Sequence, residues 1–151
     1  MEIITPNVLE NGHLDYDSID QSMLKTSTLV IPPECETLEG IACLTDITSL
    51  SIEYCHDLKE LQVPSSVTHL KLHCCDSLES ITGLSGLTHL EITRLSDIKQ
   101  VSVPDTASWD IGYCTALKEV NIVRGSSKGD DDNDSWLIRG CANLKSCTFK
   151  K

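Results

Sequence analysis

The sequence has few aromatic residues, few basic residues and no long apolar run. Aromatic side chains make up 4% of its 151 residues, so a hydrophobic core has to be built from Leu, Ile, Val and Cys. No segment approaches the roughly 18 apolar residues of a membrane-spanning helix. The first residues, Met1–Pro6, lack the basic start and the apolar run of a conventional signal peptide, so we expect no secretion by that route.

Basic residues are outnumbered by acidic ones, 12 to 23, and the formal net charge is −11. This surplus argues against a nucleic-acid backbone or an anionic membrane as the partner. The charge is uneven: residues 1–60 hold twelve acids against two lysines, a net of −10, and residues 61–151 hold eleven acids against ten bases, a net of −1. The acidic first part either attracts a basic partner or keeps the chain in solution.

Between Leu50 and Val103 one pattern of apolar residues and cysteine occurs three times. Counting from Leu50, apolar residues or cysteine stand at offsets 0, 2, 5, 8, 11 and 13, and the pattern returns after twenty residues at Leu70 and again at Leu90. In the copy that starts at Leu70, Gly83 stands at offset 13 in place of an apolar residue. Counting less regular copies, six start near residues 29, 50, 70, 90, 109 and 136. A fixed period of this size predicts a solenoid of stacked coils.

Each copy begins with a strand pattern, because offsets 0 and 2 point inward and the residues between them outward. The remaining fifteen or so residues are too few for a full helix with two loops, and Pro64 and Pro104 favour extended or 3₁₀ backbone there. We therefore predict a mainly β fold, a β-rich α/β solenoid. It is a right-handed superhelix with a parallel sheet on its concave face and a mostly non-helical convex side.

We assign residues 26–151 to the solenoid and residues 1–25 to an N-terminal cap that covers its open end. In the cap, either Asp17 or Ser18 starts a short helix, or Leu14–Tyr16 forms an outer strand. The polar run 125–134 is predicted to be a mobile loop. Calcium binding by its carboxylates is the alternative, although the run lacks the ligand spacing of an EF-hand.

Seven of the eight cysteines fall in slots that should point into the core. Five occupy the turn slot: Cys55, Cys75, Cys114 and Cys141 at offset 5, and Cys35 one residue later because its copy carries one extra residue. Cys43 and Cys147 occupy other inward slots. Buried thiols fill apolar space and act as weak donors in the turn. There is no CxxC pair, so we predict free structural thiols in a reducing compartment rather than disulfides or zinc. Cys74 alone is expected to point outward.

The stretch Ile47–Leu58 reads LxxLxLxxCxxL and resembles the leucine-rich repeat superfamily in its form with cysteine in the turn. Cys114–Ile122 and Cys141–Ser146 are similar to BspA-like bacterial and protist repeats, without the Ala-Phe that precedes their cysteine. The short period and Val63–Val67 look like repeats of bacterial effectors. That resemblance implies a protein that binds host proteins, either cytoplasmic or delivered into a host cytosol. Nothing matches the ligase domain that some effectors carry.

Alternation also predicts which residues the sheet exposes. We expect His69 beside His89, His73 near Glu53, and Lys71 near Glu91, since neighbouring strands lie about 5 Å apart. Tyr and Arg are the residue types that anchor interfaces. The predicted partner-binding residues are Glu53, Tyr54, His69, Lys71, His73, His89, Glu91, Arg94, Asp110, Tyr113 and Arg139.

These residues predict a non-enzymatic module that binds another protein and acts as a monomer or weak homodimer, with no cofactor. A metal-dependent binding protein is the alternative, with His69 and His89 as ligands and Cys74 or Glu91 completing the set. A thiol enzyme is disfavoured, because Cys74 and His73 should point to opposite sides of one strand without a third orienting group. A last alternative is the recognition fragment of a larger protein.

Overall fold

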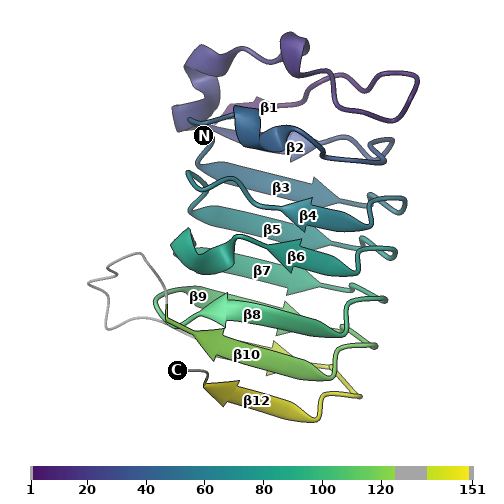
Figure 1. Cartoon of the computed structure of the whole chain (residues 1–151), viewed down its shortest axis with the longest axis vertical. Helices are drawn as coiled ribbons and strands as arrows, with labels where there is room; N and C mark the ends of the chain where they lie inside the picture. Colours follow the sequence, from purple (N-terminus) through teal and green to yellow (C-terminus); the bar gives the residue numbers. More distant parts are fainter. Residues whose placement is uncertain (1, 125–135, 150–151) are drawn as a thin grey trace.

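The computed structural model describes residues 2–124 and 136–149 and shows a stack of coils with strands on two opposite sides (Figure 1). The polar run 125–134, with the loop and calcium predictions made for it, lies outside the described residues. The wider side is a seven-stranded parallel sheet, which we call the broad sheet. In sheet order, its strands are β1 (Glu2–Ile4), β2 (Ser27–Ile31), β3 (Ser49–Glu53), β5 (His69–His73), β7 (His89–Thr93), β9 (Ser108–Gly112) and β11 (Trp136–Arg139).

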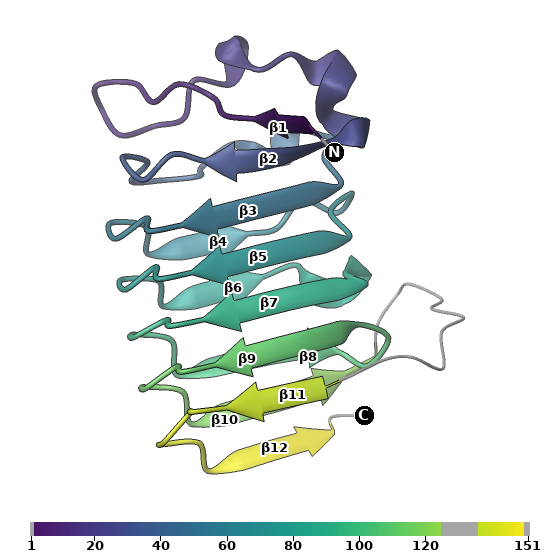
Figure 2. The same cartoon turned by 180° about the vertical axis from the view of Figure 1, so that it is seen from behind.

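The opposite side of the solenoid carries two smaller parallel sheets (Figures 1 and 2). One contains β4 (Glu60–Gln62) and β6 (Ser80–Thr82), and the other β8 (Gln100–Pro104), β10 (Glu119–Val123) and β12 (Ser146–Phe149). Two 3₁₀ turns complete it, η3 (Ile41–Cys43) and η4 (Leu84–Gly86). The predicted mainly β solenoid with a mostly non-helical second side is confirmed, and that side holds strands as well as turns.

The strand register reproduces the repeat read from the sequence. Leu50 lies opposite Leu70, Leu70 opposite Leu90, and Leu90 opposite Trp109. The inward positions are closed to solvent: Leu50 is 1% exposed and Ile52 is 0% exposed. Each coil therefore contributes one aliphatic layer to a continuous core, and burial of these layers against each other is the main source of stability.

The N-terminal segment packs its apolar side chains on the first coil. It contains β1 and two short 3₁₀ helices, η1 (Tyr16–Ser18) and η2 (Gln21–Thr26). Asp15 and Asp20 cap these helices through their carboxylates, so the expected cap at Asp17 or Ser18 is displaced by two or three residues. The strand β1 was not predicted, and the division at residue 25 stays a prediction. Among the described residues, no helix has the length and apolar character to cross a membrane.

Each broad strand from β3 onward is followed by one residue in the left-handed region. These residues, which we call the turn row, are Tyr54, Cys74, Arg94, Tyr113 and Gly140, with φ between 55° and 64°. A residue other than glycine pays about 1–2 kcal/mol in this conformation. In compensation its N–H extends the sheet ladder by one bond, as where Cys74 N donates to Thr93 O at 3.1 Å. The turn redirects the chain, so the following residue enters the core.

The cysteine prediction is correct in the middle of the solenoid and wrong at two positions. Four turn cysteines, Cys35, Cys55, Cys75 and Cys114, are buried, Cys141 is half-buried, and all eight cysteines are free thiols. The Cys55 thiol donates to the Pro32 carbonyl of the preceding coil at 3.4 Å. Cys43 and Cys147 are exposed. The 3₁₀ turn η3 sends Ile41 and Leu44 inward in place of Cys43. Cys147 lies on β12, an edge strand that nothing in the described residues covers.

Candidate partner-binding face

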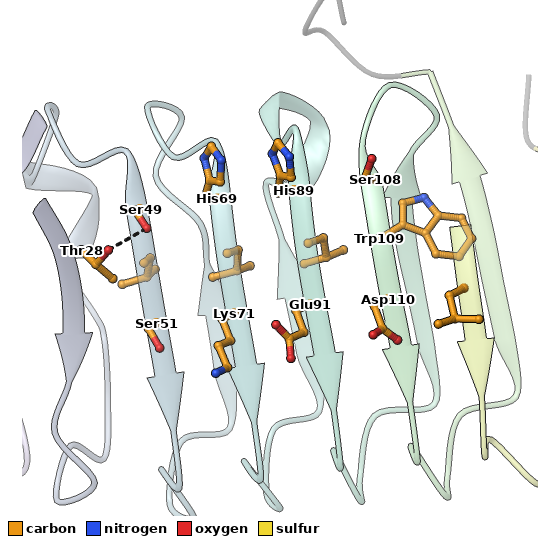
Figure 3. Close-up of a pocket in the computed structure, with 14 residues that line it drawn as sticks. Thr28, Ser49, Ser51, His69, Lys71, His89, Glu91, Ser108, Trp109 and Asp110 are labelled. Carbon is orange, nitrogen blue, oxygen red and sulfur yellow. Dashed lines mark hydrogen bonds between the residues drawn. The ribbon is translucent and has the colours of Figure 1, made fainter. Parts of the chain in front are cut away.

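A shallow groove of about 500 Å³ crosses the outer surface of the broad sheet (Figure 3). Short side chains on β3 and β9, among them Ser51 and Ser108, leave the space between the longer ones. Five of the predicted binding residues line this groove, namely His69, Lys71, His89, Glu91 and Asp110. They come from β5, β7 and β9, so sheet pairing alone brings them together from positions up to forty-one residues apart.

The two histidines of the groove form a stacked pair, as their adjacent positions predicted. The ring centroids of His69 and His89 are 4.3 Å apart with an interplanar angle of 9°. Each ring is held by its neighbour in sequence: Nδ1 of His69 lies 2.9 Å from Thr68 Oγ1, and Nδ1 of His89 lies 2.9 Å from Thr88 Oγ1. Burial, and to a smaller degree His89, lowers the pKa of His69. The two stacked rings form a flat aromatic surface on the broad sheet.

This lowered pKa predicts a loss of stability in mild acid. In the unfolded chain His69 has a pKa of about 6.5, so the unfolded chain binds this proton more readily than the folded protein does. The folded state therefore has its full stability above that pH and loses part of it as the pH falls through the lowered folded-state pKa. We expect the unfolding temperature of His69→Gln to fall less steeply between about pH 7 and pH 5 than that of the wild type. His13→Gln, in the N-terminal segment, serves as the control. Equal slopes for wild type and His69→Gln would contradict the assignment.

Two ion pairs fix the long charged side chains of the face. Lys71 Nζ lies 2.9 Å from Glu53 Oε1, and Arg139 Nη2 lies 3.1 Å from Asp110 Oδ2. The Glu53 carboxylate raises the pKa of Lys71. Lys71 stands opposite Glu91 in register, as expected, but its amine pairs diagonally with Glu53. Because both pairs are partly solvated, they stabilise the fold little and mainly orient the side chains.

The other six predicted residues lie at or beside the turn row. Tyr113 is flanked by two guanidinium groups, with Arg94 Cζ 5.5 Å and Arg139 Cζ 5.6 Å from its ring centroid. Tyr54 meets the edge of His73 at a centroid distance of 5.4 Å and an angle of 87°. Both tyrosines remain about half exposed, at 48% and 47%. The predicted residues thus form two groups, one in the groove and one beside it, and Glu53 links them through Lys71.

The groove also contains residues that the sequence reasoning missed. Trp109 and Leu137 line the groove, and Leu137 is 49% exposed. Leu137 stands one residue after the start of the last copy, the position of Ser51 and Lys71 in earlier copies, so the repeat itself could have identified it. Trp109 was assigned to the core, which is correct, since it is 3% exposed. Its lining of the groove could not be read from alternation.

The described residues contain no set of side chains that converge as the metal-dependent alternative requires. Within residues 2–124 and 136–149, no group of three or more His, Cys, Asp or Glu side chains is placed to hold an ion. The Nδ1 atoms of His69 and His89 are both engaged by threonine hydroxyls. The geometry of this face provides flat rings, paired charges and exposed tyrosines, and aromatic and arginine side chains of this kind are enriched at protein interfaces in general.

The architecture defines the chain as a parallel-strand β-solenoid with a repeat of about twenty residues, consistent with leucine-rich repeat architecture. Comparison with protein-family models found no match, and comparison with curated proteins found none. Among solved structures, a leucine-rich repeat protein from Bacteroides ovatus is similar at 13% identity and a TM-score of 0.23. That comparison covers 99% of this chain and 64% of the other.

Proposed function

We propose that this chain is a non-enzymatic protein-interaction module that binds another protein on the broad sheet. The observation that carries the proposal is the groove across β5, β7 and β9, flanked by the half-exposed Tyr54 and Tyr113. Rigid strands present these side chains, so little conformational entropy is lost on binding. A solenoid fold supports such a role because its sheet forms an extended surface.

The charge distribution favours a partner with mixed polarity at the contact. Lys71 and Arg139 are already paired with acids of the same face, so a partner meets neighbouring charges of both signs rather than a single-sign patch. Electrostatic complementarity of this kind sets orientation and specificity more than affinity. A narrower assignment, an effector that acts on a host protein, rests on the resemblance of the repeats and on the solenoid fold.

The test replaces His69, His89 and Arg94 together with alanine. All three side chains are exposed, so we expect the thermal unfolding temperature to change little. Proteins retained by the immobilised wild type should bind the triple variant at least about tenfold more weakly, because interface anchors of this type contribute about 2 kcal/mol or more each. Binding is measured by surface-based titration of each retained protein.

A matched triple variant on the opposite side provides the control. Gln62, Thr82 and Gln100 are exposed on β4, β6 and β8, and their replacement with alanine should leave partner affinity unchanged. Equal loss in both triple variants, or no loss in the broad-sheet variant, would reject the broad sheet as the binding surface. Loss of folding in the broad-sheet variant would show that these residues are structural.

A further inference from the structure

Cys74 lies within hydrogen-bond distance of a histidine that is itself oriented by a threonine. Cys74 Sγ is 3.4 Å from His73 Nε2, and His73 Nδ1 is 2.6 Å from Thr93 Oγ1. The sequence argument against this couple assumed that consecutive residues point to opposite sides of the sheet. It fails because Cys74 has φ 55°, and the left-handed turn swings its thiol back towards the ring of His73.

Thr93 is the third group, the one that orients His73, and strand alternation did not reveal it. Thr93 stands opposite His73 on β7 and is 7% exposed, so its hydroxyl holds the imidazole from a fixed position. With Nδ1–H donating to Thr93 Oγ1, Nε2 carries the lone pair and accepts the thiol proton. The edge contact with Tyr54 covers His73 further. A base next to a thiol, with a group that orients the base, is the arrangement that activates a sulfur nucleophile.

We propose that Cys74, with His73 as its base and Thr93 as a positioning residue, is a site of thiol–disulfide exchange with small-molecule disulfides. The Cys74 proton moves to His73 Nε2, and the thiolate attacks one sulfur of the disulfide. The new bond joins Cys74 to that sulfur, the original S–S bond breaks, and the departing thiolate takes the proton from the imidazolium. The disulfide is the oxidant, and a free thiol reverses the reaction.

The electrostatic surroundings explain why the imidazole is needed. Burial raises the pKa of the Cys74 thiol, and Arg94 opposes this rise. The remaining titratable groups that act on the thiol are Asp76, Cys75 and Glu53, and each raises its pKa. Because the pKa of the thiol is raised, little thiolate forms at neutral pH without a base. The thiolate is the attacking species, so the reaction needs His73 to take the proton. The site is separate from the groove residues, and its chemistry holds whatever partner the broad sheet binds.

The test measures mixed-disulfide formation with glutathione disulfide in a Cys43→Ser/Cys147→Ser background, which removes the two exposed thiols. We expect a single adduct per chain by intact-mass spectrometry, mapped to Cys74 by peptide analysis. His73→Gln should lower its rate constant at pH 7 by at least about tenfold, the lower range for general-base assistance. The difference in rate constant between His73→Gln and the background should shrink at alkaline pH, where the thiolate forms without a base. His13→Gln, in the N-terminal segment, should react as the background does.

Thr93 is tested by the pair Thr93→Val and Thr93→Ser. The valine variant removes the hydroxyl and should slow the reaction at neutral pH, whereas the serine variant restores the hydroxyl and should keep the rate. If the valine variant does not fold, His73→Gln and Thr93→Ser decide alone, and far-ultraviolet circular dichroism verifies the fold of each variant. An adduct on Cys141 instead of Cys74, or equal neutral rates for His73→Gln and the background, would overturn the proposal.

Discussion

Replacing Leu72 with alanine should lower the free energy of unfolding by about 2–5 kcal/mol, the range for truncating a buried leucine. Leu72 lies in the middle of β5, is 0% exposed, and stands between Ile52 and Ile92 of the neighbouring coils. Its truncation leaves a cavity that faces two aliphatic layers at once. Because each coil contacts only its neighbours, weakening one layer weakens both interfaces that it forms.

The matched control is Lys71→Ala, one residue earlier on the same strand with its side chain in solvent. Loss of its ion pair with Glu53 should change stability by no more than about 0.5–1 kcal/mol. Urea denaturation followed by circular dichroism measures both variants, and the unfolding midpoint of Leu72→Ala should fall well below that of the control. Similar midpoints for the two variants would mean that β5 is not packed as the structure has it.

Replacing Trp136 with alanine should cost about 2 kcal/mol, less than the 3–5 kcal/mol for a fully buried tryptophan, because its side chain is partly in solvent. Trp136 is 41% exposed, and its ring stacks on Trp109 with centroids 5.3 Å apart. Its Nε1–H also donates to the Ala107 carbonyl at 2.9 Å. The side chain therefore covers the preceding coil, and removing it opens Trp109 to water.

Tryptophan fluorescence reads this change directly, because the chain has two tryptophans. In Trp136→Ala the emission comes from Trp109 alone, and we expect it to shift to longer wavelength than a buried indole shows. Trp136→Phe keeps the stacking and loses the hydrogen bond, so it should cost about 1 kcal/mol. Leu137→Ala, exposed on the same strand, is the control. Unchanged stability in Trp136→Ala would show that the stack contributes nothing.

The solenoid was predictable because its core follows from periodicity. The spacing of Leu50, Leu70 and Leu90 determines both the repeat and the strand register, and each strand needs only alternation to define its inward face. The stacked pair of His69 and His89 follows from the same register, since residues twenty apart meet on neighbouring strands. For the inward positions of β3, β5, β7 and β9, alternation along the strand was sufficient.

The sequence reasoning failed where the backbone leaves the strand. Cys43 was placed inward by counting, but a 3₁₀ turn has three residues per turn and rotates the side chains differently from an extended chain. Cys74 was placed away from His73 for the same reason, because a left-handed residue breaks the two-residue alternation. Strand register also does not determine which ion pairs form. Lys71 stands opposite Glu91 in register, but its long side chain reaches Glu53 and pairs with it.

The turn row already holds tyrosine, cysteine, arginine and glycine at one backbone position in successive coils. Its conformation is thus maintained by the ladder hydrogen bond and by the buried residue that follows, not by the side chain itself. Exchanging residues there alters the edge of the broad sheet without altering the coil. If the broad sheet binds a partner as proposed, natural variation or directed evolution at the turn row would change partner preference one coil at a time, on a backbone that stays the same.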